Sequence, residues 1–182
     1  FDRFNLYKRI TITLPSIREV SDLKLRNVVR ASPPIDAVPG TRNNGERAYQ
    51  DFALICTGEA NPVTDGTALE GLRVAQVRVL FDFPVFYPAQ SATSKPLEYI
   101  EWFTLFSCPE AGSDLHVLRR STRQQRPYAE IIDLDRIACN CFLTPRSGAG
   151  ATDRRWTSEA VTELCPSFYF NPYLNTHTFC TV

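Results

Sequence analysis

The 182-residue sequence predicts a mainly β fold, an antiparallel barrel or sandwich with long loops and one short helix near the C-terminus. Three observations support this fold class. Short segments alternate apolar and polar side chains with the two-residue period of a strand. Turn signals containing proline, glycine, asparagine or aspartate separate these segments. Only one segment has the start and stop signals of a helix.

The composition is that of one folded domain without a strong overall charge. The chain is 43% hydrophobic and 12% aromatic, which is enough for a sizeable core. The formal net charge is zero, so whole-chain electrostatics gives no argument for a nucleic-acid or membrane partner. No apolar run approaches the roughly 20 residues that cross a bilayer. We therefore expect one domain spanning 1–182, in which the strands of 1–57 are a candidate added sheet.

The N-terminal part contains three predicted strands. Lys8–Leu14 alternates strictly and ends at Pro15, which cannot continue a hydrogen-bonded ladder. Leu23–Ala31 alternates in the same way. Asp51–Thr57 contains a compact apolar run that is typical of a buried strand.

The central part contains the two longest predicted strands. Leu72–Phe83 is interrupted by polar residues, so we expect one of its sides to meet solvent. Leu97–Phe106 is rich in aromatic residues and carries bulky apolar groups on both faces. The proline-containing segment 84–96 between them is predicted to be a loop.

The C-terminal part combines short strands with the single helix. Strands are predicted at Leu115–Arg119, Tyr128–Leu134 and Cys139–Thr144, with a polar loop over 120–127. The predicted helix begins at a cap formed by Thr157 or Ser158, has Glu159 near its positive N-terminal end, and is stopped by Pro166.

The sequence contains no motif that indicates catalysis, a metal or a cofactor. His116 is predicted to be structural, and a small hydrolase would require His116 or His177 beside a serine or cysteine. Asp133 and Asp135 would share a strand face, but a turn around Leu134 is the favoured interpretation. We therefore expect neither enzymatic activity nor a small-molecule substrate.

Two basic segments are the predicted contact surface. The segment 119–126 has four arginines and no acidic residue, and its serine, threonine and glutamine residues also suit phosphate contacts. A second basic spot places two arginines beside a tryptophan that could stack on a base. Solvated loops are the alternative for both. The candidate nucleic-acid-binding residues are Arg119, Arg120, Arg123, Arg126, Arg154, Arg155 and Trp156.

Four aromatic residues form a further candidate site. Rings around a cation can recognise a methylated lysine by cation–π attraction. Aromatic residues in strands more often belong to the core, which is the alternative here. The candidate cage residues are Tyr99, Trp102, Phe103 and Tyr128.

The six cysteines leave two cellular settings open. An even number of cysteines allows a disulfide-stapled secreted β-sandwich that binds carbohydrate or assembles as a structural subunit. The sequence lacks an N-x-S/T glycosylation signal, however, and this favours reduced cysteines in an intracellular protein. We further expect a nuclear location. Thiol titration of the denatured, unreduced protein separates the two hypotheses.

Several short motifs follow one another along the chain, among them Tyr99-Ile100-Glu101-Trp102-Phe103, the segment 131–137 and the aromatic segment 168–173. Their order resembles the C-terminal region of fungal transposases of the Plavaka and Kyakuja-Dileera-Zisupton type. The likeness begins upstream, at 12–15, and covers most of the chain. In those transposases the catalytic acidic triad lies upstream of this region. The resemblance therefore implies a non-catalytic accessory domain of a transposon-derived protein.

The pattern from 72–81 to the aromatic tail also looks like a bromo-adjacent homology domain, which is a β-barrel-based module of chromatin proteins. That resemblance implies a barrel over 71–182 that contacts DNA, a nucleosome or histone, or another protein. The N-terminal strands of 1–57 depart from this pattern, because such a module does not obviously need them.

Overall fold

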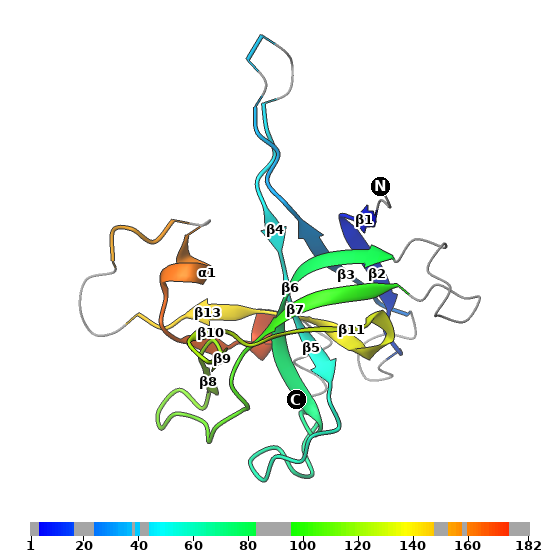
Figure 1. The fold of residues 1–182 in the computed structure, drawn as a ribbon. Helices are drawn as coiled ribbons and strands as arrows, with labels where there is room; N and C mark the ends of the chain where they lie inside the picture. Colours follow the sequence, from blue (N-terminus) through cyan, green and yellow to red (C-terminus); the bar gives the residue numbers. More distant parts are fainter. Residues whose placement is uncertain are drawn as a thin grey trace.

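The computed structural model describes residues 4–16, 24–37, 39–40, 44–82, 96–147, 153–157 and 160–174. The predicted fold class is confirmed: the strands pair antiparallel, and one short helix, α1 (Val161–Leu164), lies near the C-terminus (Figure 1). The strands in this described part form open sheets and no closed barrel. None of its helices is long and apolar enough to cross a membrane.

The main sheet is built around the longest strand, β6. Its order is β11 (Ala129–Asp133), β7 (Leu97–Trp102), β6 (Leu72–Asp82), β5 (Phe52–Cys56) and β12 (Ile137–Cys141). The strand β1 (Asn5–Tyr7) also pairs with β6. The first half of β6 pairs with β5, and the end of β6 pairs with β1. The main sheet therefore includes two strands from 1–57, while the other described strands of that region form a separate sheet.

The separate sheet packs on the main sheet. It consists of β2 (Arg9–Thr13), β3 (Arg26–Ser32) and β4 (Tyr49–Gln50). Alternate residues of β3 are buried, as the sequence predicted: Asn27, Val29 and Ala31 face inward, whereas Arg26 and Arg30 are exposed. Since β3 contacts β6 and β12, its buried face covers part of the main sheet.

A third sheet has the order β13 (Leu143–Pro145), β14 (Phe168–Phe170) and β8 (Val117–Leu118). The single strand predicted over Cys139–Thr144 is thus two strands, β12 and β13, in different sheets. The chain leaves one sheet for the other at Phe142, which is exposed. A two-stranded sheet of β9 (Thr122–Arg123) and β10 (Arg126–Pro127) and two one-turn 3-10 helices, η1 (Leu134–Arg136) and η2 (Pro172–Leu174), complete the described elements.

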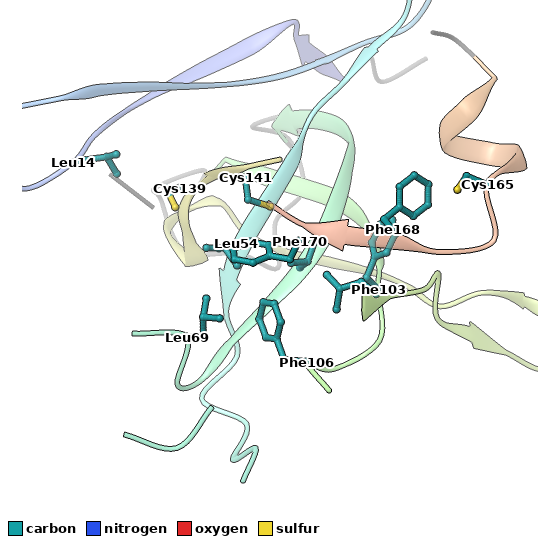
Figure 2. Close-up of a cluster of buried hydrophobic side chains, with 12 residues drawn as sticks. Leu14, Leu54, Leu69, Phe103, Phe106, Cys139, Cys141, Cys165, Phe168 and Phe170 are labelled. Carbon is teal, nitrogen blue, oxygen red and sulfur yellow. The ribbon is translucent and has the colours of Figure 1, made fainter. Parts of the chain in front are cut away.

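Two clusters of buried side chains hold the sheets together. In the first, aromatic rings meet edge to face, with ring centroids 5.8 Å apart for Phe103 and Phe168 and 5.3 Å apart for Phe106 and Phe170 (Figure 2). The second cluster includes Ile100 and joins the main sheet to β3. Because consecutive residues of a strand point to opposite faces, the segment from Leu97 to Phe103 supplies both clusters, as the sequence predicted.

The expectation that one side of β6 meets solvent is wrong for its centre. Val74, Ala75, Gln76 and Val77 are all buried. Val74 belongs to the first cluster and Ala75 to the second, so both faces of the strand are covered.

The helix α1 is shorter than the predicted one and comprises a single turn. The predicted cap at Thr157 or Ser158 is wrong for this turn: Ala160 is the N-cap and has no side-chain cap hydrogen bond. The Thr157 hydroxyl instead accepts a hydrogen bond from the backbone N–H of Ala160 at 3.1 Å, one residue before the helix begins. The helix ends before Pro166, as expected. Ser158 and Glu159 lie outside the described residues, as does the predicted loop 84–96 except for its last residue, Pro96.

Candidate nucleic-acid interface

The basic segment predicted to be a loop contains a tight β-hairpin. Strand β9 (Thr122–Arg123) pairs with β10 (Arg126–Pro127), and only Gln124 and Gln125 connect them. Both glutamines have positive φ angles, 51° and 63°. Two-residue hairpin turns in which both residues have positive φ are normally made by Asn-Gly, because residues other than glycine and asparagine disfavour positive φ. The hairpin therefore holds two long amide side chains at an exposed, strained tip.

The hairpin also places two like charges opposite each other. Arg123 and Arg126 are direct cross-strand partners, and both are exposed. Like charges at this spacing destabilise a strand pair. The structure records no ion pair for either arginine among its described residues. Bringing a negatively charged group to this tip would relieve the repulsion.

Arg119 adds a third exposed guanidinium near the base of the hairpin. Its backbone is held by Thr104, whose N–H donates to the Arg119 carbonyl and whose hydroxyl accepts from the Arg119 N–H. Its side chain is left to solvent. The exposed set from this segment is therefore Arg119, Arg123 and Arg126.

Arg120 does not belong to this exposed set, because its guanidinium points into the protein. It donates to Glu101 at 3.0 Å, to Gln76 at 2.9 Å and to the carbonyl of Thr162. Its side chain is only 19% exposed. Burial lowers the pKa of Arg120, and the nearby carboxylates of Glu163 and Glu101 oppose this effect. Arg120 thus joins the hairpin to the main sheet and to α1.

Arg78 completes this ionic cluster. It donates to Glu101 and to Glu163, each at 2.8 Å, so both arginines share the same two carboxylates. The strand register shifts between Val77 and Val79, and this β-bulge at Arg78 redirects its side chain. Nothing in the sequence indicated this cluster, because its paired members lie between 19 and 85 residues apart.

The second predicted basic spot is only partly exposed. Arg155 binds Asp153 through its side chain and its backbone N–H, and these hydrogen bonds lower the pKa of Asp153. Trp156 is half-buried and packs against the first cluster. Arg154 is exposed. Of these three residues, only Arg154 presents its side chain without a recorded partner in the described part of the chain.

The four predicted cage residues do not converge on one site. Phe103 is buried in the first cluster and Trp102 in the second, so they lie on opposite faces. Trp102 and Tyr128 contact the guanidinium of Arg73, 5.1 Å and 5.6 Å from their ring centroids. These two rings therefore already surround a cation of their own chain. Tyr99 lies on the opposite face of β7 from Trp102.

The remaining polar candidates have local partners. His116 Nδ1 lies 2.6 Å from the carbonyl oxygen of Ser107, and its ring packs on Phe106. Asp133 ends β11 whereas Asp135 lies in η1, so the two do not share a strand face. No group of three metal-ligating side chains occurs among the described residues, and His177 lies outside them.

The cysteines of the described chain differ in environment. Cys56 and Cys108 are exposed and not disulfide-bonded. Cys139 and Cys141 both lie in the first cluster, which agrees with their predicted position on one strand face. Burial raises the pKa of the Cys141 thiol, which keeps it protonated. Cys180 lies outside the described residues.

Comparisons with protein-family models, with curated proteins and with solved structures each gave no match.

Proposed function

We propose that this chain is a non-catalytic, DNA-associated binding domain of a larger, transposon-derived protein, and that the β9–β10 hairpin makes the contact. The observation that carries the proposal is the direct opposition of Arg123 and Arg126 at an exposed tip. Like charges in this arrangement cost free energy in the unbound protein. A phosphate group between them would convert that repulsion into two charge-assisted hydrogen bonds.

The shape of the hairpin also suits DNA. The major groove admits a two-stranded β-ribbon, and the β9–β10 connection is the shortest common type. Gln124 and Gln125 at its tip are amide side chains, which can pair with adenine, whereas arginine can contact phosphate or guanine. Strained backbone positions tend to occur at functional sites. A glycine at position 124 or 125 would relieve the backbone strain but would remove the side-chain amide.

The sequence resemblance to transposase accessory regions supports the same function. It implies a domain that associates with DNA or chromatin while the catalytic residues lie elsewhere in the protein. The hairpin offers a surface for that role that involves Arg119, Arg123 and Arg126. Arg120 takes part indirectly, by fixing the base of the hairpin.

A binding titration with a short DNA duplex at several salt concentrations tests the proposal. Changing Arg123→Gln together with Arg126→Gln should weaken binding at least about tenfold, and should reduce the slope of log affinity against log salt by about 2. The double variant Lys8→Gln with Arg47→Gln removes the same charge from exposed positions outside the hairpin and serves as the control.

Three results would overturn the proposal. The first is unchanged duplex affinity of the hairpin variant at low salt, and the second is an equal loss in the control. A parallel titration with nucleosomes distinguishes contact with DNA from contact with histones. Binding to nucleosomes without binding to the duplex would contradict the DNA contact and assign the domain to histone protein.

A further inference from the structure

A cleft of about 790 Å³ lies on another part of the molecule, between the β2–β3 pair and the point where the chain passes from β12 to β13. Its volume is within the range of about 300–1,000 Å³ that is typical of sites for small organic ligands. Both charged and apolar side chains line it. Arg9, Arg26 and Arg30 supply the positive charge, and Phe52, Phe142 and Leu174 are among the apolar residues.

The positive charge of the cleft is only partly compensated. Arg30 binds the Asp51 carboxylate through two side-chain hydrogen bonds, each of 3.0 Å. Arg9 stands directly opposite Arg30 across the strand pair, and Arg26 stands opposite Thr13. Neither the Arg9 side chain nor the Arg26 side chain has a recorded hydrogen bond or ion pair with any described residue. Two exposed guanidiniums therefore remain at the rim, one of them in a like-charge pair.

The apolar half of the cleft includes an exposed ring. Phe142 lies at the break between β12 and β13 and is 40% exposed. No ring contact is recorded for it within the described chain, although the other phenylalanines of this region, such as Phe52, pack edge to face. An exposed aromatic face beside free guanidiniums is the arrangement that stacks a base while binding its phosphate.

The amides of the cleft are already paired. The Asn27 side chain donates to the Asn140 side-chain oxygen and accepts from the Asn140 backbone N–H. The Asn140 side-chain N–H group donates to the carbonyl of Val28. These groups hold β3 against β12 and are not available to read the edge of a base. A ring in this cleft would therefore be held by stacking, with little preference between bases.

We propose that this cleft binds a nucleotide unit, with its phosphate at Arg9 and Arg26 and its base against Phe142. The proposal does not depend on DNA binding by the hairpin. The same chemistry can come from a free nucleotide or from one unit of a single strand. The sequence pointed to no small-molecule site here, because the residues involved come from segments more than 100 positions apart.

Calorimetric titration of the 182-residue chain tests the cleft with three probes: inorganic phosphate, a deoxythymidine 5′-monophosphate and an oligothymidylate of about ten units. Changing Arg9→Gln together with Arg26→Gln should weaken all three at least about tenfold, because a charge-assisted contact is lost. Changing Phe142→Leu keeps an apolar side chain but removes the ring. It should weaken the nucleotide and the oligonucleotide about tenfold and leave phosphate binding unchanged.

The variant Lys8→Gln with Arg47→Gln is the matched control, since it removes the same charge from exposed positions outside the cleft lining and should leave mononucleotide affinity unchanged. Tighter binding of the oligonucleotide than of the mononucleotide identifies a single strand as the ligand, and equal affinity identifies a free nucleotide. The proposal is overturned if the wild-type chain binds none of the probes, if phosphate binds as tightly as the nucleotide, or if the cleft variants leave nucleotide affinity unchanged.

Discussion

Glu98 makes the stability of the folded protein depend on pH in a direction opposite to that of most carboxylates. Its side chain is fully buried, between Leu80 on β6 and Ile132 on β11. Neither carboxylate oxygen has a hydrogen-bond partner in the described structure. Burial raises its pKa from 4.5 to about 8, and the positive charge of Arg136 opposes this only in part.

The sign and the size of the effect follow from proton linkage. Between pH 4.5 and about 8 the folded protein keeps the Glu98 proton, whereas the unfolded chain has released it. The free energy of unfolding must then fall as the pH rises, by about 1.4 kcal/mol per pH unit in this window. At pH 7 the free energy of unfolding is therefore about 3 kcal/mol lower than at pH 4.5 because of this group.

The variant Glu98→Gln cannot ionise at this position and should remove this contribution. We expect urea unfolding at pH 5, 6, 7 and 8 to give a free energy whose decrease with pH is about 1.4 kcal/mol per unit smaller than in the wild type. The variant Asp65→Asn, which changes an exposed acid, should keep the wild-type dependence. Equal pH dependence in the wild type and in Glu98→Gln would refute the reasoning.

Three further predictions concern the hairpin and the cysteines. Arg120→Ala should lower the free energy of unfolding by about 3 kcal/mol in urea, because it leaves buried acceptors unpaired, whereas Arg119→Ala should change it by less than about 0.5 kcal/mol; equal effects would contradict the assigned contacts. Gln125→Gly should stabilise the protein by up to about 1 kcal/mol in the same assay by relieving a positive φ, and destabilisation would argue against that turn. A thiol reagent should modify Cys56 and Cys108 in the native protein and the buried cysteines only after unfolding; protection of the first two would contradict their exposure.

The strands could be predicted from the sequence where one face is apolar and the other polar. Lys8–Leu14 is such a case: its alternation matches β2 (Arg9–Thr13), because the side chains of Ile10 and Ile12 pack inward. The strand β5 was predictable for another reason, since a short apolar run flanked by turn signals suits a strand covered on both faces.

The hairpin could not be predicted in the same way. Residues 122–127 are all exposed, so nothing in their hydrophobic pattern marks two strands. Their connection, Gln124-Gln125, is not one of the residue pairs that normally signal such a turn. The division of one predicted strand at Phe142 was hidden as well, because Cys141, Phe142 and Leu143 form an apolar run with no turn residue at the break.

The roles of the arginines depend on residues far away in the sequence. Arg119 and Arg120 are neighbours, yet one is exposed and the other binds Thr162 and Glu101. The amino-acid composition could identify the basic segment. Only the packing of α1 and the bulge at Arg78 decide which guanidinium is bound inside the protein and which is exposed.

The base of the hairpin is fixed to the main sheet on both sides. The Ser121 N–H donates to the Trp102 carbonyl, the Trp102 N–H donates to the Tyr128 carbonyl, and Arg120 is held between β7 and α1. A hairpin anchored in this way loses little conformational entropy when a ligand binds, since its backbone is already ordered. Removing these contacts at the base of the hairpin, while Arg123 and Arg126 are kept, would therefore weaken ligand binding through a larger entropy cost. The charge of the contact surface would not change.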